Sequence, residues 1–173
     1  MIRWLNSQYQ ELIRLQFHKM AHFAEIKEVT DPTGFTSDSH WVVQRVVVVG
    51  NDISTAAGPL GENDMHVDGE TWCQNFFKRG IWKQISYNHN FRKQYAGKGF
   101  VYNAAKDIFI VPQPFASWSL DGNDDWQAPV THPTDTTDKI NIDWDEAGQQ
   151  WTAQDHDHNS FTWDASELTW VAS

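Results

Sequence analysis

The sequence contains a single cysteine, Cys73, and no long apolar run. One cysteine excludes a framework of disulfide bonds, and the lack of a CxxC pair or a cysteine–histidine cluster argues against a structural zinc site. The most apolar stretch, residues 46–49 with Val42 and Val43 before them, is far shorter than the ~20 residues of a membrane-spanning helix. The first residues also lack the pattern of a signal peptide. We therefore expect a soluble protein, made inside the cell, that has no membrane partner.

Basic residues are scarce as well. Thirteen Lys and Arg stand against 23 Asp and Glu, which gives a net charge of −10. This balance argues against binding to nucleic acid, which requires a basic surface. It is compatible with solubility at high copy number or with a partner that has a basic surface. Aromatic residues, in contrast, are abundant, with ten Trp, ten Phe and four Tyr, and such side chains let small modules bury enough area to fold.

The most informative pattern is an aromatic pair that recurs four times in the second half of the chain. The pairs are Tyr102…Phe109, Trp118…Trp126, Trp144…Trp151 and Trp163…Trp170. Three of them are seven positions apart, so a four-residue loop with one flanking residue on each side places the two aromatics opposite each other on a β-hairpin. Cross-strand aromatic pairs stabilise such hairpins by up to about 1 kcal/mol. The spacing of eight needs a different loop, for which Gly122 supplies a residue that accepts positive φ easily.

The first 19 residues form a separate segment with helical periodicity. Apolar residues recur at the spacing of an amphipathic helix; they are Ile2, Leu5, Tyr9, Leu12 and Ile13. An isolated helix of this length needs a surface on which to bury that stripe. The surface belongs either to a partner subunit, in which case the segment is a docking helix, or to the chain's own domain.

A small sheet with one helix is expected from residue 20 to residue 111. Residues 20–26 alternate as a strand, residues 41–49 form a second strand whose residues 46–49 are fully buried, and residues 82–87 form a third. Asp68 or Thr71 would cap a short helix through Trp72, Phe76 and Phe77, ended by Gly80. Residues 88–99 form a polar loop that carries much of the local positive charge, on Arg92, Lys93 and Lys98. Prolines at 112, 114, 129 and 133 separate the hairpins of a third segment, residues 112–173.

Several of these segments together resemble a known group of proteins. They are Met20-Ala-His-Phe-Ala-Glu-Ile, Ser86-Tyr-Asn, Arg92-Lys-Gln-Tyr-Ala-Gly, Asp107-Ile-Phe-Ile-Val-Pro-Gln-Pro-Phe-Ala-Ser-Trp and the Trp-Asp-Glu unit at residue 144. The combination resembles small proteins of marine tailed phages, especially cyanophages, over residues 20–151. The resemblance implies a virion-associated protein and offers no catalytic residues. Residues 1–19 and the last hairpin, residues 161–171, go beyond that pattern.

Few residues suggest chemistry. Residues 155–158, Asp-His-Asp-His, fit either a divalent metal site or a polar loop, and Cys73 fits a buried apolar residue better than a nucleophile. Asp143, Asp145 and Glu146 have the types of a glycosidase pair but are ordinary turn carboxylates. The loop at residues 121–125 lacks the spacing of a calcium loop, and residues 97–99, Gly-Lys-Gly, indicate a turn. We therefore predict no catalytic, cofactor-binding or metal-binding residue.

The aromatic pairs have three interpretations. They form miniature cores, they bind neighbouring proteins, or their exposed faces stack on sugar rings; the residues concerned are Trp118, Trp126, Trp144, Trp151, Trp163 and Trp170. The structural interpretation is favoured because burying one such ring contributes about 1.5–3 kcal/mol and these small units have little else to bury. Trp is also common at binding hot spots.

Taken together, the sequence predicts a mainly β protein of the α+β type. It has an N-terminal amphipathic helix, a small sheet with one short helix and a C-terminal string of aromatic β-hairpins. The expected function is that of a non-enzymatic structural component of a tailed-phage virion, either capsid-decorating or tail-associated. Its partners would be other virion subunits in many copies, and its location the virion. The alternative is a carbohydrate-binding adhesin module that contacts a host-surface glycan through the Trp pairs.

Overall fold

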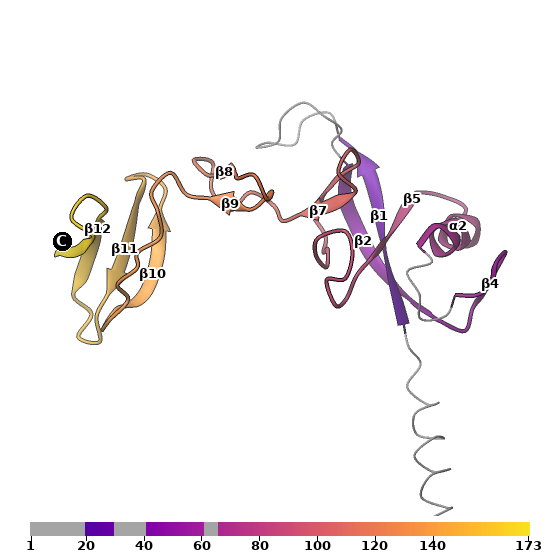
Figure 1. Ribbon diagram of the computed structural model, residues 1–173, viewed down its shortest axis with the longest axis horizontal. Coiled ribbons are helices and arrows are strands. Elements are labelled where there is room, and N and C mark those ends of the chain that lie inside the picture. The colour runs from indigo at the N-terminus through magenta and orange to yellow at the C-terminus, as the bar shows by residue number, and fades with distance from the viewer. Residues whose placement is uncertain (1–19, 30–40, 61–65) are drawn as a thin grey trace, which may run out of the picture. The chain divides into compact units, whose positions relative to one another are not determined.

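The computed structural model describes residues 20–29, 41–60 and 66–173 of the chain. The chain divides into two compact units, residues 1–112 (unit 1) and residues 113–173 (unit 2) (Figure 1). The division lies beside the prolines at which the sequence suggested a boundary. The expected mainly β fold is confirmed. The predicted docking helix, with Ile2, Leu5, Tyr9, Leu12 and Ile13, lies outside the described residues.

Unit 1 contains an antiparallel sheet with the strand order β5-β1-β2-β6-β7. Its elements are β1 (Met20–Glu28), β2 (Trp41–Gly50), β3 (Ser54–Thr55), β4 (Gly58–Pro59), α2 (His66–Phe77), β5 (Ile81–Ile85), β6 (Val101–Asn103) and β7 (Ile108–Ile110). The three strands expected from the hydrophobic pattern are all present, the third as the shorter β5. The sheet is curled, and α2 lies beside β5 (Figure 1).

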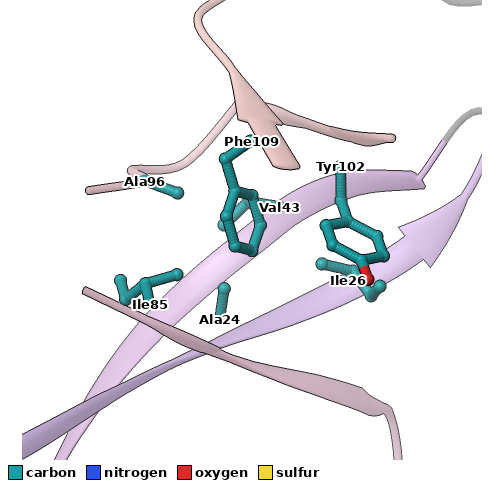
Figure 2. Packing of buried hydrophobic residues seen from close by; sticks show 7 residues of the cluster. All are labelled: Ala24, Ile26, Val43, Ile85, Ala96, Tyr102 and Phe109. Atoms are coloured by element: carbon teal, nitrogen blue, oxygen red, sulfur yellow. The ribbon is translucent and has the colours of Figure 1, made fainter. Parts of the chain in front are cut away.

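The inner strand β1 contributes buried residues to both faces of the sheet, which gives unit 1 two small cores. On the side of α2, Phe23 packs with Leu60, Cys73 and Trp82. On the other side, the rings of Tyr102 and Phe109 point from the β6–β7 hairpin toward β1 and β2 (Figure 2). The second core consists of Ala24, Ile26, Val43, Ile85, Ala96, Tyr102 and Phe109.

The predicted helix is present as α2, but its predicted caps are wrong. Asp68 lies in the first turn of the helix and Thr71 lies inside it, where its hydroxyl donates to the carbonyl oxygen of Val67 at 2.8 Å. The helix approaches β1 closely at Gly69, since a Cβ atom there would lie 2.3 Å from the Phe23 ring. Glycine at this position is therefore required by packing, although it weakens the helix itself.

The expectation that residues 46–49 form a fully buried strand is wrong. Val48 is 52% exposed, whereas Val49 is buried. The reason is the short length of β6, which pairs only with Trp41 and Val42 at one end of β2. Among the described strands, none pairs beyond this point with the edge of β2 that faces away from β1. Val46 packs against one core and Val47 and Val49 against the other, so of the four valines only Val48 is left exposed. A run of valines alone does not distinguish this arrangement from a strand that is buried on both sides.

Unit 2 contains a two-stranded hairpin and a four-stranded antiparallel sheet with the order β10-β11-β12-β13. Its strands are β8 (Ser119–Leu120), β9 (Trp126–Gln127), β10 (Ile140–Asp145), β11 (Gln150–Gln154), β12 (Ser160–Asp164) and β13 (Thr169–Ala172). Register and alternation place the four Trp residues of the larger sheet on one face with Ala153, Phe161 and Ala172. The other face carries its Thr, Gln and Asp residues together with Val171, which lies opposite Thr162. The predicted hairpin of residues 161–171 is present as β12–β13.

Candidate functional site

Three of the four predicted aromatic pairs are confirmed in register. Tyr102 lies opposite Phe109, Trp144 opposite Trp151, and Trp163 opposite Trp170. Their ring centroids are 5.1, 5.3 and 5.2 Å apart, which is the range of favourable tilted and edge-to-face contacts. The register of β11 and β12 also brings the four Trp residues of the larger sheet into one row across its apolar face.

The fourth predicted pair is wrong. Trp126 lies opposite Leu120 rather than Trp118, because the loop between them needs five residues. Trp118 instead packs edge-on against Trp144 and Trp151, at 6.3 and 5.9 Å between ring centroids. Gly122 does not supply the positive φ either, since Asp124 adopts it with φ 61°.

The residue after the first aromatic of each confirmed pair shapes the loop. Oδ1 of Asn103, Asp145 and Asp164 accepts a hydrogen bond from the backbone N–H of Ala105, Ala147 and Ser166, respectively. The last loop residue has positive φ in all three hairpins: Asp107 at 51°, Gln149 at 48° and Leu168 at 52°. The Asn or Asp of the repeat is thus a turn residue, a role that its regular position next to the aromatic could have revealed.

The predicted Trp site is largely internal. Trp126, Trp144, Trp151 and Trp163 are buried, with at most 9% of their surface exposed, while Trp118 and Trp170 are half-buried. Three indole N–H groups donate within the chain, from Trp144 to Glu146, from Trp151 to the Val130 carbonyl and from Trp170 to the Asp135 carbonyl, at 2.7–2.9 Å. The ring faces, and the indole N–H groups of Trp144, Trp151 and Trp170, are therefore used mainly for folding.

The metal-like segment, residues 155–158, forms a turn. Oδ1 of Asp155 accepts the backbone N–H groups of Asp157 and Asn159, both at 2.9 Å, and His158 has φ 64°. Asp121 binds the N–H groups of Asn123 and Asp125 in the same way, with positive φ at Asp124. The two loops thus have one geometry. Within the described part of the chain, no group of three or more His, Cys, Asp or Glu residues is placed to hold a metal ion.

The other candidate residues also have structural partners. Burial and the nearby Glu70 raise the pKa of the Cys73 thiol to about 12, so it stays protonated at neutral pH. Glu146 accepts hydrogen bonds from the hydroxyl and the backbone N–H of Ser117, at 2.7 and 2.8 Å, and from the Trp144 indole. Glu146 thereby holds the segment of Ser117 against the β10–β11 hairpin.

Four carboxyl groups of unit 2 have a pKa below the ordinary value because their ionised forms accept these loop hydrogen bonds. The donors with the largest effect are Thr137 for Asp135, Ser117 for Glu146, Asn159 for Asp155 and Ser166 for Asp164. Asp135 is exposed and the other three residues are half-buried at the surface, so water still screens their interactions.

The most buried charge among the described residues of unit 1 was not recognised from the sequence. The Arg92 side chain is only 4% exposed, and its guanidinium binds Glu70 at 2.6 Å and Asp107 at 2.8 Å. Tyr102 donates its hydroxyl to Asp107, and Lys83 lies 3.5 Å from Glu70. Burial opposes ionisation of Asp107, but the hydrogen bond from Tyr102 and the charge of Arg92 outweigh it and lower the pKa of Asp107. We call these five residues the Arg92 network.

Arg92 satisfies backbone groups on both edges of the unit 1 sheet. On β5, the Gln84 carbonyl accepts from Arg92 at 2.8 Å, while the Gln84 N–H donates to Glu70 at 2.8 Å. On β7, the N–H of Phe109 donates to the Arg92 carbonyl at 3.2 Å, and the Gln94 amide donates to the Phe109 carbonyl at 3.0 Å. The segment around Arg92 therefore joins the two edges of the curled sheet and protects them from pairing with another chain.

Charge is distributed unequally between the units. Residues 113–173 contain twelve of the 23 acidic residues and one of the 13 basic residues, Lys139, so unit 2 has a net charge of −11 and residues 1–112 have +1. The acidity seen in the whole sequence thus belongs to unit 2. Its electrostatic potential favours positively charged partners and opposes the approach of a second such unit.

Among the described residues, no helix is long and apolar enough to span a membrane. A comparison of the chain with protein-family models, curated proteins and solved structures finds no match.

Proposed function

We propose that this chain is a non-enzymatic structural subunit of a tailed-phage virion. It binds neighbouring virion proteins as a capsid-decorating or tail-associated component. The main support for the proposal is that the side chains capable of chemistry have structural roles in this fold. Cys73 is a buried, protonated thiol, Asp155 closes a turn, and Glu146 joins two segments. Each of these groups contributes to folding, which is what a scaffold requires.

The hairpin repeat gives further support. It uses one loop geometry three times, once in unit 1 and twice in unit 2. In unit 2 it also places four Trp rings in a row, so it builds a small folded unit from little chain. The strong segregation of charge supports a role in assembly, because a unit with net charge −11 attracts basic protein surfaces. The resemblance of residues 20–151 to small marine-phage proteins supplies the virion context.

The glycan-binding alternative has less support from the geometry. Stacking on a sugar requires an accessible ring face, but four of the six Trp residues named for it are buried among themselves and their neighbours. Of the six, only Trp118 and Trp170 are partly exposed. If the chain binds glycans, these two rings are the first to change: Trp170→Ala should weaken binding to a glycan array, and the buried rings should not respond except through unfolding.

The experiment for the proposed role is stepwise disassembly of purified virions. Quantitative mass spectrometry compares the amount of this chain with those of the major capsid and tail proteins in each fraction. A non-structural phage protein serves as the control for carry-over from the lysate. We expect this chain to remain after washing and to be released together with one structural fraction.

The outcomes separate the two locations. Hundreds of copies that follow the capsid would identify a decorating subunit, while a few to tens of copies that follow the tail would identify a tail component. An amount no greater than that of the non-structural control would overturn the proposal.

A further inference from the structure

The last strand of the unit 2 sheet, β13, has an edge that no described strand covers. The N–H of Ser173 donates to the carbonyl of Ser160 on β12, at 2.9 Å. Alternation along an antiparallel pair then directs the backbone groups of Val171 toward β12 and those of Trp170 and Ala172 outward. Two residues thus present N–H and C=O groups in the positions that an added strand would use.

Apart from its length of only four residues, this edge lacks the features that protect sheet edges. β13 reads Thr-Trp-Val-Ala, without charge, proline or bulge, and Val171 is 50% exposed. The opposite edge, β10, differs, because it has a bulge between Ile140 and Asp143 and positive φ at Asn141. In unit 1, both edge strands are joined to the segment of Arg92. β13 is therefore the better template for pairing with another chain.

A groove adjoins this edge. It has a volume of about 670 Å³, and its lining includes Gln150, Thr162, Asp164, Val171 and Ala172. These residues come from β11, β12 and β13. A strand added at β13 would therefore place alternate side chains beside this groove, which is how strand addition gains specificity beyond backbone hydrogen bonds.

The net charge of unit 2 indicates which kind of strand would bind at β13. Lys139 is the one basic residue of unit 2, and its net charge is −11. A second copy approaching through the same edge would bring two such units together, and this repulsion is strongest at low ionic strength. A basic segment would instead be attracted. The part of the β2 edge that no described strand pairs with is also open, but it offers no comparable preference for a charged partner, because residues 1–112 have a net charge of only +1.

We propose that the edge of β13 binds an extended, basic segment of a partner protein, which adds to the unit 2 sheet as a fifth strand. Hydrogen bonds from Trp170 and Ala172 give the pairing its register, and the acidic unit favours lysine- or arginine-rich segments. The inference rests on the proposed role as a subunit that binds neighbouring proteins, and it names the surface and the chemistry of that partner.

The test uses the full chain and a short, blocked peptide of alternating lysine and valine, with binding measured by fluorescence anisotropy. Two control peptides have glutamate in place of lysine or carry N-methyl groups on one edge. The key variant is Ala172→Pro, which removes an outward N–H and leaves the bonds to β12 in place. Ala172→Val keeps that N–H and is the matched control. Val171→Lys adds a positive charge beside the edge and supplies a second variant, should the proline disturb folding.

We expect saturable binding of the basic peptide that weakens as salt increases. Ala172→Pro should weaken it about tenfold or more, because a hydrogen bond is lost and its neighbours are crowded, whereas Ala172→Val should bind like the unchanged chain. Val171→Lys should also weaken it. The acidic and N-methylated peptides should bind poorly.

Three results would overturn the inference: no binding of the basic peptide, equal binding of the N-methylated peptide, or binding unaffected by both Ala172→Pro and Val171→Lys. Sedimentation that shows dimers of the unchanged chain and monomers of Ala172→Pro would assign the edge to a second copy instead. The virion measurement is independent of these results. If the chain is absent from virions but still binds the peptide through β13, the binding surface stands and only the virion role is overturned.

Discussion

Substituting Arg92 by methionine should destabilise unit 1 strongly. Methionine matches much of the volume but leaves Glu70, whose side chain is 13% exposed, with Lys83 at 3.5 Å as its remaining cation. Breaking a buried ion pair by removing one partner costs about 3–5 kcal/mol. Asp107 adds little, because its side chain is 53% exposed and water can replace the guanidinium. Since each 1.4 kcal/mol is about a factor of ten, the opening equilibrium should increase about 100- to 4,000-fold.

Hydrogen exchange by mass spectrometry of the full chain can measure this change. The amides of β5 and β7 should lose protection by that factor, because Arg92 satisfies backbone groups of Gln84 and Phe109 on these strands. Peptides from β10–β13 provide an internal reference in the other unit. Arg79→Met is the matched control, since Arg79 is exposed, and it should leave both units unchanged.

A second substitution tests the mechanism. Adding Glu70→Gln to Arg92→Met removes the uncompensated charge but keeps an acceptor for the N–H of Gln84, so the double variant should regain part of the protection. The reasoning is refuted if Arg92→Met behaves like Arg79→Met. It also fails if Glu70→Gln makes the Arg92→Met protein less stable, because Glu70 would then act independently of Arg92.

Gly69→Ala should destabilise unit 1 in urea by about 1–3 kcal/mol through its clash with Phe23, although alanine favours helices. Asn75→Ala, at an exposed position of the same helix, should not destabilise unit 1. An equal response of the two variants would contradict the packing argument. Asp164→Ala should lower the thermal stability of unit 2, followed by circular dichroism, while Asp164→Asn should largely retain it, because Asn103 makes the equivalent turn. Unit 2 should also respond to pH and salt. Its four carboxyl groups with lowered pKa stabilise the fold at pH values above the ordinary carboxyl pKa of about 4. This stabilisation should be lost as the pH falls through the pKa values that these groups have in the folded protein. At pH 7, raising the ionic strength from about 0.01 M to about 1 M should stabilise unit 2 by screening its net charge of −11; an unchanged or lowered melting temperature would contradict this.

The hairpins could be predicted because their information is local. A spacing of seven fixes the loop length, and the aromatic pair and the turn residue all lie within eight consecutive residues. The same rule failed at Trp118, whose partners Trp144 and Trp151 lie far along the sequence. The spacing of eight between Trp118 and Trp126 resembles that of the repeat, but the loop between these two residues is different.

Arg92 could not be recognised from the sequence for the same reason. It lies in a polar loop beside Lys93, where an arginine is ordinarily exposed. Its partners, Glu70 and Asp107, are 22 and 15 residues away, and only the curled sheet brings them together. The valines of β2 present a similar case, because the short length of β6 decides their burial.

The two units solve the problem of sheet edges differently, and this difference bears on where the chain can bind. Unit 1 joins both of its edge strands to one segment through the backbone and side chains of Arg92 and Gln94. Unit 2 uses three of its indole N–H groups to fix its own segments and buries four of its Trp rings, so the aromatic repeat leaves little ring surface for recognition. What unit 2 still presents is backbone at β13 and many carboxylates. Both are matched by an extended basic segment, and a partner that needs exposed Trp faces would not fit this surface.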